Sequence, residues 1–149
     1  MQFPFSKNEY NYGIVTWVTQ LVVHDKYRQH GIAKNLLFSI WGFSNHFAWG
    51  IVSANPYAIR ALEKATRRRC CTYANKKRIL LNKKTLGDKM FPFIYEDTQF
   101  QIAEDSATVN TAFVDHSDTM QMLKNVITEE VPWNLGLIDE GWEWFALYF

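Results

Sequence analysis

Residues 18–37, VTQLVVHDKYRQHGIAKNLL, constrain the fold most, because a strand pattern changes to a helix pattern at a glycine. Residues 18–23 are apolar and rich in β-branched side chains, which is typical of a buried strand. Beyond Gly31 the apolar residues recur at helical spacing, on one face of the helix, at Ile32, Leu36, Leu37 and Ile40. The stretch therefore predicts a strand over residues 13–23, a polar loop, and a helix from Gly31 to about residue 43.

The loop between this strand and this helix is suited to bind an anion. The first N–H groups of a helix have no partner within the helix, and the helix dipole places partial positive charge there. Gly31 lets the backbone approach an anion without a Cβ in the way, and Arg28 and Lys34 add positive charge. The loop therefore predicts a phosphate or pyrophosphate site. Neither common nucleotide-binding pattern, G-x-G-x-x-G or G-x-x-x-x-G-K-[ST], is present.

A second strand and helix follow directly. Residues 47–53, FAWGIVS, have the pattern of a buried strand, and the strand–helix–strand order predicts a parallel pair. Asn55 is a favourable N-cap and Pro56 suits the first helical position, so a helix is expected to about residue 68. Its inward face is predicted from small and apolar residues at Ala58, Ala61, Leu62 and Ala65.

These two units resemble the GNAT superfamily of acetyl-CoA-dependent N-acyltransferases, and their amino-acid sequence is most similar to that of fungal members. Arg28, Gly31 and Ala33 match the motif A pattern [RQ]-x-x-G-x-[GA] that opens a helix after a strand. Asn55, followed three residues later by Ala58, matches motif B. The resemblance implies an α/β fold, a GNAT-like mixed central sheet flanked by helices.

In that family three strands precede the motif A strand, whereas residues 1–12 here have an irregular pattern. The expected fold therefore lacks the usual first three strands. It is a single domain over residues 1–149, with an acetyl-CoA-binding core in 1–69 and a divergent half in 70–149. A truncated product, a degenerate protein and a site completed by another chain all fit this pattern. The resulting exposed sheet edge suggests a homodimer or a second chain that covers it.

The resemblance implies acyl transfer from acetyl-CoA, as cosubstrate, to an amine by direct attack, without a covalent enzyme intermediate. Backbone N–H groups near the strand end would polarise the thioester carbonyl, the loop would hold the pyrophosphate, and Asn55 would hydrogen-bond the pantetheine arm. The cofactor-binding residues implied are Leu21, Val22, Val23, Arg28, Gln29, His30, Gly31, Ile32, Ala33 and Asn55.

The chain departs from the family pattern at the catalytic groups. Many members carry a tyrosine as general acid seven residues after the motif B asparagine, and that position is Leu62 here. The motif A strand contains no acidic residue that would serve as a base, and His24 is interpreted as a loop histidine rather than a base acting through water. The catalytic residues are therefore not assigned. The alternative function is a non-catalytic CoA-binding or protein-interaction module.

The second half of the chain predicts further elements in less detail. A helix is expected over residues 75–90, with Ile79, Leu80 and Leu86 facing inward. A short strand within 91–102 and a strand over 107–114 follow. The chain then predicts a helix over 117–127, capped by Asp115 or Ser117 and with Met120, Leu123 and Ile127 facing inward, and a closing strand over 143–149. The last two strands are expected to match the family's sixth and seventh, with a helix inserted between them.

The charge distribution and the cysteine content limit the kinds of partner and the cellular compartment that are expected. The net charge is +1, but most Lys and Arg lie in residues 26–89 and most Asp and Glu lie in 90–149. The basic residues at 67–69, 76–78 and 83–84 favour a solvated helix face over contact with the 3′-phosphate of CoA or with nucleic acid.

The adjacent Cys70 and Cys71 suit neither an ordinary disulfide nor a C-x-x-C metal site, so an intracellular, cytoplasmic protein is expected, with the nucleus also open. Neither a metal nor a membrane is predicted as a partner. The acceptor amine is not identified.

Overall fold

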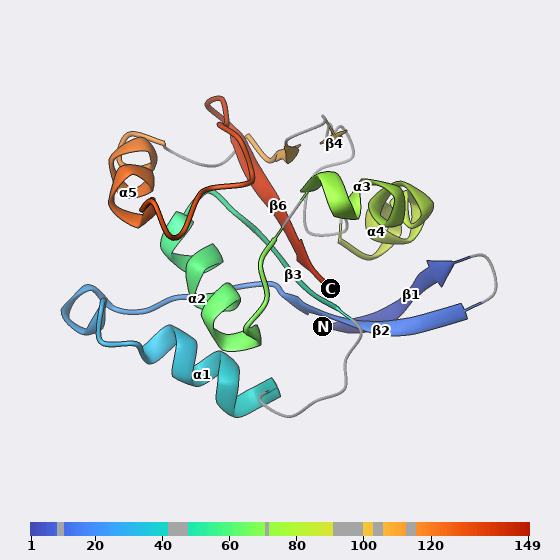
Figure 1. The fold of residues 1–149 in the computed structure, drawn as a ribbon, viewed down its shortest axis with the longest axis horizontal. Helices are drawn as coiled ribbons and strands as arrows, with labels where there is room; N and C mark the ends of the chain where they lie inside the picture. The colour runs from blue at the N-terminus through green and yellow to red at the C-terminus, as the bar shows by residue number, and fades with distance from the viewer. Residues whose placement is uncertain (9–10, 42–47, 71, 91–99, 103–105, 113–115) are drawn as a thin grey trace.

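A six-stranded mixed sheet with helices on both faces forms the centre of the computed structural model (Figure 1). The structure describes residues 1–8, 11–41, 48–70, 72–90, 100–102, 106–112 and 116–149. The strand order is β1-β2-β3-β6-β5-β4. Only β2 and β3 are parallel, and every other neighbouring pair in this sheet is antiparallel. The α/β class expected from the sequence is confirmed.

The strands are β1 (Gln2–Asn8), β2 (Asn11–Val18), β3 (Ala48–Ser53), β4 (Phe100–Ile102), β5 (Ala107–Asn110) and β6 (Trp142–Tyr148). The helices are α1 (Ile32–Trp41), α2 (Pro56–Thr66), α3 (Thr72–Leu81), α4 (Lys83–Met90) and α5 (Thr119–Val126), with a 3-10 turn, η1 (Asp25–Tyr27). The predicted parallel pair is confirmed, because β2, α1 and β3 form a strand–helix–strand unit. None of the described helices has the length and apolar character needed to cross a membrane.

The irregular start predicted for residues 1–12 is wrong. β1 pairs with β2 from Gln2 opposite Thr16 to Asn8 opposite Asn11. The two backbone bonds between Met1 and Trp17, of 2.7 and 3.0 Å, extend this pairing to the first residue. The sequence QFPFSKN alternates as an edge strand does, and an edge tolerates its proline. The edge of β2 that was expected to be exposed is therefore covered by the chain itself.

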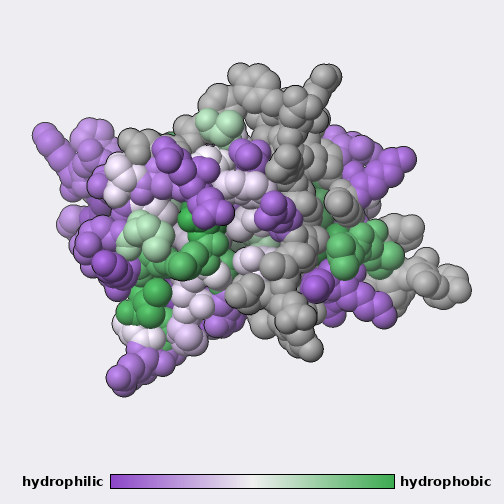
Figure 2. All heavy atoms as spheres, turned by 90° about the horizontal axis from the view of Figure 1, so that it is seen from above, coloured by the Kyte–Doolittle hydropathy of each residue, from purple (hydrophilic) through white to green (hydrophobic). Residues whose placement is uncertain are grey.

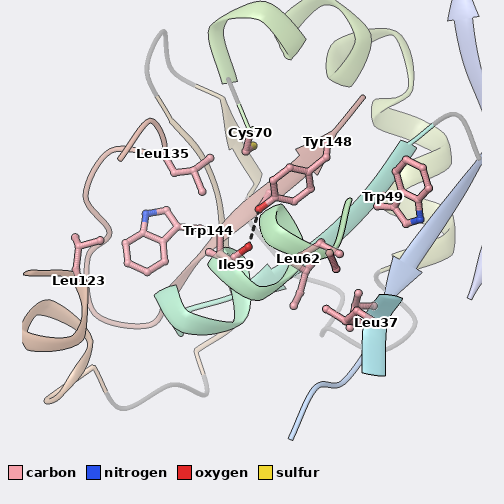
Figure 3. Close-up of a cluster of buried hydrophobic side chains, with 13 residues drawn as sticks. Leu37, Trp49, Ile59, Leu62, Cys70, Leu123, Leu135, Trp144 and Tyr148 are labelled. Carbon is pink, nitrogen blue, oxygen red and sulfur yellow. Dashed lines mark hydrogen bonds between the residues drawn. The ribbon is translucent and has the colours of Figure 1, made fainter. Parts of the chain in front are cut away.

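One core lies between the sheet and helices α1, α2 and α5 (Figure 3). Trp144 and Tyr148 of β6 pack here with Leu37 of α1, and with Ile59 and Leu62 of α2. The Tyr148 hydroxyl donates a hydrogen bond to the Ile59 carbonyl at 3.3 Å. Burial raises the pKa of Tyr148 well above its ordinary value, so the hydroxyl stays protonated and keeps donating this bond.

A second core lies on the opposite face, because side chains alternate along each strand. Phe145 and Leu147 of β6 point to this face, where Ile79 of α3 and Leu86 of α4 cover them. The single helix predicted over residues 75–90 is wrong, since the chain forms two helices separated at Asn82. The Asn82 side-chain amide donates to the carbonyl of Arg78 at 2.8 Å, which competes with continued helical bonding. The buried positions of Ile79 and Leu86 are confirmed, but Leu80 is exposed.

Two helices bury less of their apolar face than their sequences predict. Of the four residues predicted to face inward in α1, Leu37 is buried, whereas Ile32, Leu36 and Ile40 are exposed. Of the three residues predicted to face inward around α5, Leu123 is buried, whereas Met120 and Ile127 are exposed. The reason is placement, because α1 and α5 both pack beside α2 and each presents a narrow row to the core. Seen from above, the surface is largely hydrophilic with separate hydrophobic areas (Figure 2).

The cap expected for α5 is also different. The helix begins at Thr119 with Asp118 as its N-cap, and the Asp118 side chain makes no capping hydrogen bond. Of the two residues expected to cap it, Ser117 precedes the actual N-cap, and Asp115 lies outside the described residues, as does Cys71.

Candidate functional site

One edge of the sheet gathers the residues expected to bind a ligand. Because β2 and β3 are parallel, their carboxyl ends meet at the same edge. β5 also ends there, since it pairs antiparallel with β6, which pairs antiparallel with β3. The described segments that leave this edge are 19–31, 54–55 and 111–112. Ligands of open α/β sheets bind outside the carboxyl ends of strands, so this edge is the candidate site.

The two parallel strands separate at this edge (Figure 1). Their pairing ends at Val18 and Ile51. Beyond this point β3 continues to Ser53, whereas the segment that follows β2 leaves the sheet. The strand predicted to reach residue 23 therefore ends five residues early, and Val22 is 84% exposed. Among the described strands, none pairs with residues 19–23.

Leu21 turns back to pack against the α2-side core, which helps to draw this segment away from the sheet. Within the described part of the chain, the amides of Leu21, Val22 and Val23 donate no hydrogen bond, so they remain available to a ligand.

The loop after this segment is braced by its own side chains. The Arg28 guanidinium pairs with Asp25 at 2.6 Å and donates through Nε to the carbonyl of Val23 at 3.1 Å. A ring nitrogen of His30 lies 2.7 Å from the Arg28 carbonyl oxygen. His24 caps η1 by accepting from the Lys26 amide at 3.3 Å, which fits its interpretation as a loop histidine. Arg28 therefore shapes the loop as well as adding positive charge.

The start of α1 has the geometry that an anion site needs. Gln29 and Gly31 both have positive φ, 65° and 74°, and a glycine takes this conformation without strain. The Asn35 amide donates to the Gly31 carbonyl at 2.9 Å, so the amides of residues 32–34 precede the first helical bond. A Cβ built on Gly31 would meet nothing within 4 Å. The space above this backbone is thus open to a ligand.

Asn55 begins α2 as predicted. Its Oδ1 accepts from the amides of Tyr57 at 2.9 Å and Ala58 at 3.3 Å. The Nδ2 group makes no hydrogen bond with the described residues, and the side chain is exposed, so it can donate to a ligand. Leu62 is fully buried in the core, and its aliphatic side chain has no proton to transfer.

Three polar residues at this edge were not identified from the sequence. Glu143, the second residue of β6, accepts a hydrogen bond from the Ala54 amide at 3.1 Å. The Thr111 side chain also hydrogen-bonds this carboxylate, and His116 lies close enough for its charge to act on it. Burial raises the pKa of Glu143, and these three neighbours only partly offset that rise. The available signal was a single acidic residue inside the apolar strand WEWFALY.

This raised pKa predicts how stability depends on pH. Between 4.5, the ordinary value, and its raised pKa, the folded chain binds the Glu143 proton more tightly than the unfolded chain does. The free energy of unfolding therefore loses this contribution as pH rises through that interval. Glu143→Gln removes the titration, so its stability relative to wild type should increase from acidic to neutral pH. Urea denaturation at a series of pH values measures this difference, and a difference independent of pH would contradict the prediction.

A hollow of about 550 Å³ lies elsewhere, between the end of α2 and the chain after α5. It is lined by Tyr57, Arg60, Glu63, Lys64, Arg67, Arg68, Arg69, Asn125, Val126, Thr128 and Val131. None of the ten predicted cofactor-binding residues lines it.

The predicted basic cluster is divided rather than continuous. Arg68 lies 4.3 Å over the ring of Trp49 on the α2 side of the sheet, and Arg69 pairs with Glu63. Arg78 lies 4.6 Å over Phe149, which packs against the core of the opposite face. Cations over aromatic rings serve packing as well as solvation. Arg68 and Arg78 therefore pack on opposite faces of the sheet.

Comparison with known proteins adds no family to this geometry. Among the residues that the structure describes, no three His, Cys, Asp or Glu side chains are grouped to hold a metal ion. The chain matches no protein-family model, no curated protein and no solved structure.

Proposed function

We propose that this chain is a GNAT-like acetyltransferase that binds acetyl-CoA and transfers the acetyl group to an amine by direct attack. The observation that carries the proposal is the separation of β2 from β3 beside the open backbone of Gly31. A parallel pair that separates next to a helix N-terminus offers one crevice for an extended thioester with a phosphorylated end.

The arrangement of donors along this crevice supports the proposal. The first amides of α1 would hold the pyrophosphate, and Asn55 Nδ2 would donate to the pantetheine arm. The free amides of residues 21–23 would face the thioester carbonyl. Donors that are aimed at a developing oxyanion each contribute about 3 kcal/mol to lowering the barrier. Direct attack then needs no nucleophile from the protein.

A non-catalytic CoA-binding module is the second candidate, and the buried Leu62 at the usual acid position favours it. Both candidates require acetyl-CoA binding, but only the enzyme releases free CoA thiol when an amine is added. Cys70 is a buried thiol that donates to the Leu147 carbonyl at 3.3 Å, and we place the proposed activity in the reducing cytoplasm.

Calorimetry with acetyl-CoA tests the shared binding step. Wild type should bind with micromolar affinity, and Gly31→Asp should weaken binding at least about tenfold, because its carboxylate would enter the pyrophosphate site. Gly31→Asn is the matched control, since Asn has a similar size and also tolerates positive φ but carries no charge. A folded wild-type chain that does not bind acetyl-CoA would refute the proposal.

Variants of Asn55 separate its two roles. Asn55→Asp keeps the oxygen that caps α2 but removes the Nδ2 donor, so it should weaken acetyl-CoA binding with little loss of stability. Asn55→Ala removes both and should also cost about 1 kcal/mol of stability. Calorimetry and urea denaturation measure the two effects. Unchanged affinity in a folded Asn55→Asp protein would show that Asn55 is only a cap.

A further inference from the structure

Transfer to an amine requires a group that removes a proton, and β2 supplies none. An amine attacks a thioester only as the neutral base, so a positioned proton acceptor accelerates the reaction. In the cofactor site described above, the imidazole of His30 lies 2.7 Å from the Arg28 carbonyl oxygen and braces the loop. At the same edge of the sheet, however, β6 contributes a carboxylate, that of Glu143.

The position of Glu143 follows from the strand order. β6 lies between β3 and β5, with Trp144 opposite Ser53 and Glu143 opposite Val109. The carboxylate receives the Ala54 amide at 3.1 Å, and Ala54 immediately precedes Asn55. Glu143 therefore lies at the carboxyl end of β3, close to Asn55, the residue proposed to hold the pantetheine arm, and β3 separates it from β2.

The surroundings of Glu143 are held in place by further hydrogen bonds. Thr119 Oγ1 donates to the Ala54 carbonyl at 3.2 Å, and the Thr119 amide donates to the His116 carbonyl at 3.0 Å. The Thr111 amide donates to the Gly141 carbonyl at 2.9 Å, close to the start of β6. These bonds connect the chain segments around the carboxylate, so its position is defined by the backbone.

The surroundings of Glu143 favour proton binding. Glu143 is only partly exposed, and burial raises its pKa above the ordinary value, so this carboxylate binds a proton more tightly than an exposed one does. His116 is the titratable group that acts on it, and Thr111 and Ala54 supply uncharged donors. The Nε2 atom of His116 is buried and makes no hydrogen bond to the described residues, so the imidazole is not committed to another partner.

We propose that Glu143 is the general base of this site, an inference that rests on the proposed acetyl transfer. The carboxylate takes one proton from the ammonium form of the acceptor, and the freed nitrogen pair attacks the thioester carbon. The C–N bond forms, the C–S bond breaks, and the second amine proton goes to the departing CoA thiolate. Glu143 then returns its proton to water. Acetyl-CoA and an ammonium ion thus give an amide, CoA thiol and one proton.

The test compares two acceptors in wild type and Glu143→Gln, with release of CoA thiol as the readout. Propylamine is protonated at pH 7 and needs a base, whereas hydroxylamine is already neutral. Glutamine keeps an oxygen that accepts from the Ala54 amide, so the fold should be retained. Transfer to propylamine should fall about 100-fold, with a much smaller loss for hydroxylamine. Glu140→Gln, an exposed neighbour, is the control and should match wild type with both acceptors.

Calorimetry with acetyl-CoA on the same proteins distinguishes failure of the proposed function from failure of the Glu143 assignment. If wild type does not bind acetyl-CoA, the proposed function itself fails, and the assignment of Glu143 fails with it. If wild type transfers to propylamine and Glu143→Gln does so at the same rate, only the assignment of Glu143 is overturned. If the two acceptors lose rate equally, Glu143 positions the site and is not its base. If wild type binds acetyl-CoA but reacts with neither acceptor, the catalytic assignment is wrong and the binding-module candidate stands.

Discussion

Replacing Glu63 with glutamine should lower the free energy of unfolding by about 3–5 kcal/mol. Glu63 is 6% exposed, and its carboxylate accepts hydrogen bonds from Arg60 at 2.5 Å and from the Cys70 amide at 3.3 Å. The substitution leaves the Arg60 guanidinium buried without its counter-ion. A buried, uncompensated charge is costly because the protein interior screens it poorly and water cannot solvate it.

The cost should be large because Arg60 cannot move to solvent without breaking other contacts. Its other terminal nitrogen donates to the carbonyls of Val131 and Pro132, each at 3.0 Å. The guanidinium also lies 5.0 Å from the ring centre of Trp133. Arg60 therefore ties α2 to the chain that follows α5, and loss of its charge partner should loosen that connection.

Urea denaturation monitored by tryptophan fluorescence measures this effect. Lys64→Gln, an exposed change at the next position of α2, should alter stability by no more than about 0.5 kcal/mol. The double variant Arg60→Met with Glu63→Leu should be closer to wild type than Glu63→Gln is, since it removes both charges together. A Glu63→Gln protein as stable as wild type would show that the pair does not hold α2 in place.

Gly50→Ala should destabilise the chain by about 3 kcal/mol, at the upper end of the usual cost of overpacking. Gly50 is opposite Trp17 in the parallel β2–β3 pair, and a Cβ at Gly50 would overlap carbons of the indole ring. Trp17 is 4% exposed, and its ring centre lies 5.1 Å from that of Phe145, so the ring cannot rotate away freely. Only a glycine leaves room for this tryptophan.

A second substitution, at Trp17, tests whether the clash with the indole ring causes this loss of stability. Trp17→Leu should itself be destabilising because it leaves a cavity, but it also removes the ring that the new methyl group would strike. The double variant should therefore lose less stability than the sum of the two single variants, by about 1 kcal/mol or more in denaturation experiments. Strict additivity would mean that Gly50→Ala acts through backbone conformation instead.

Local features of the sequence determined much of the first half of this protein. The parallel unit of β2, α1 and β3 was predictable because hydrophobic periodicity changes within a short window, from a strand pattern to a helix pattern. Gly31 and Asn55 were identifiable because a positive φ and a helix N-cap each favour few residue types. Such preferences act between near neighbours and do not depend on the rest of the fold.

Tertiary structure alone decided which surfaces meet. The helical pattern of α1 could not indicate that Ile40 is exposed, because burial depends on where α2 and α5 lie. Residues 2–8 become a strand because the edge of β2 offers unpaired backbone groups. Glu143 and Ala54, which are 89 residues apart in the sequence, meet only because β6 inserts between β3 and β5. The sequence determined the local elements, and the long-range strand order placed the candidate base beside the candidate cofactor site.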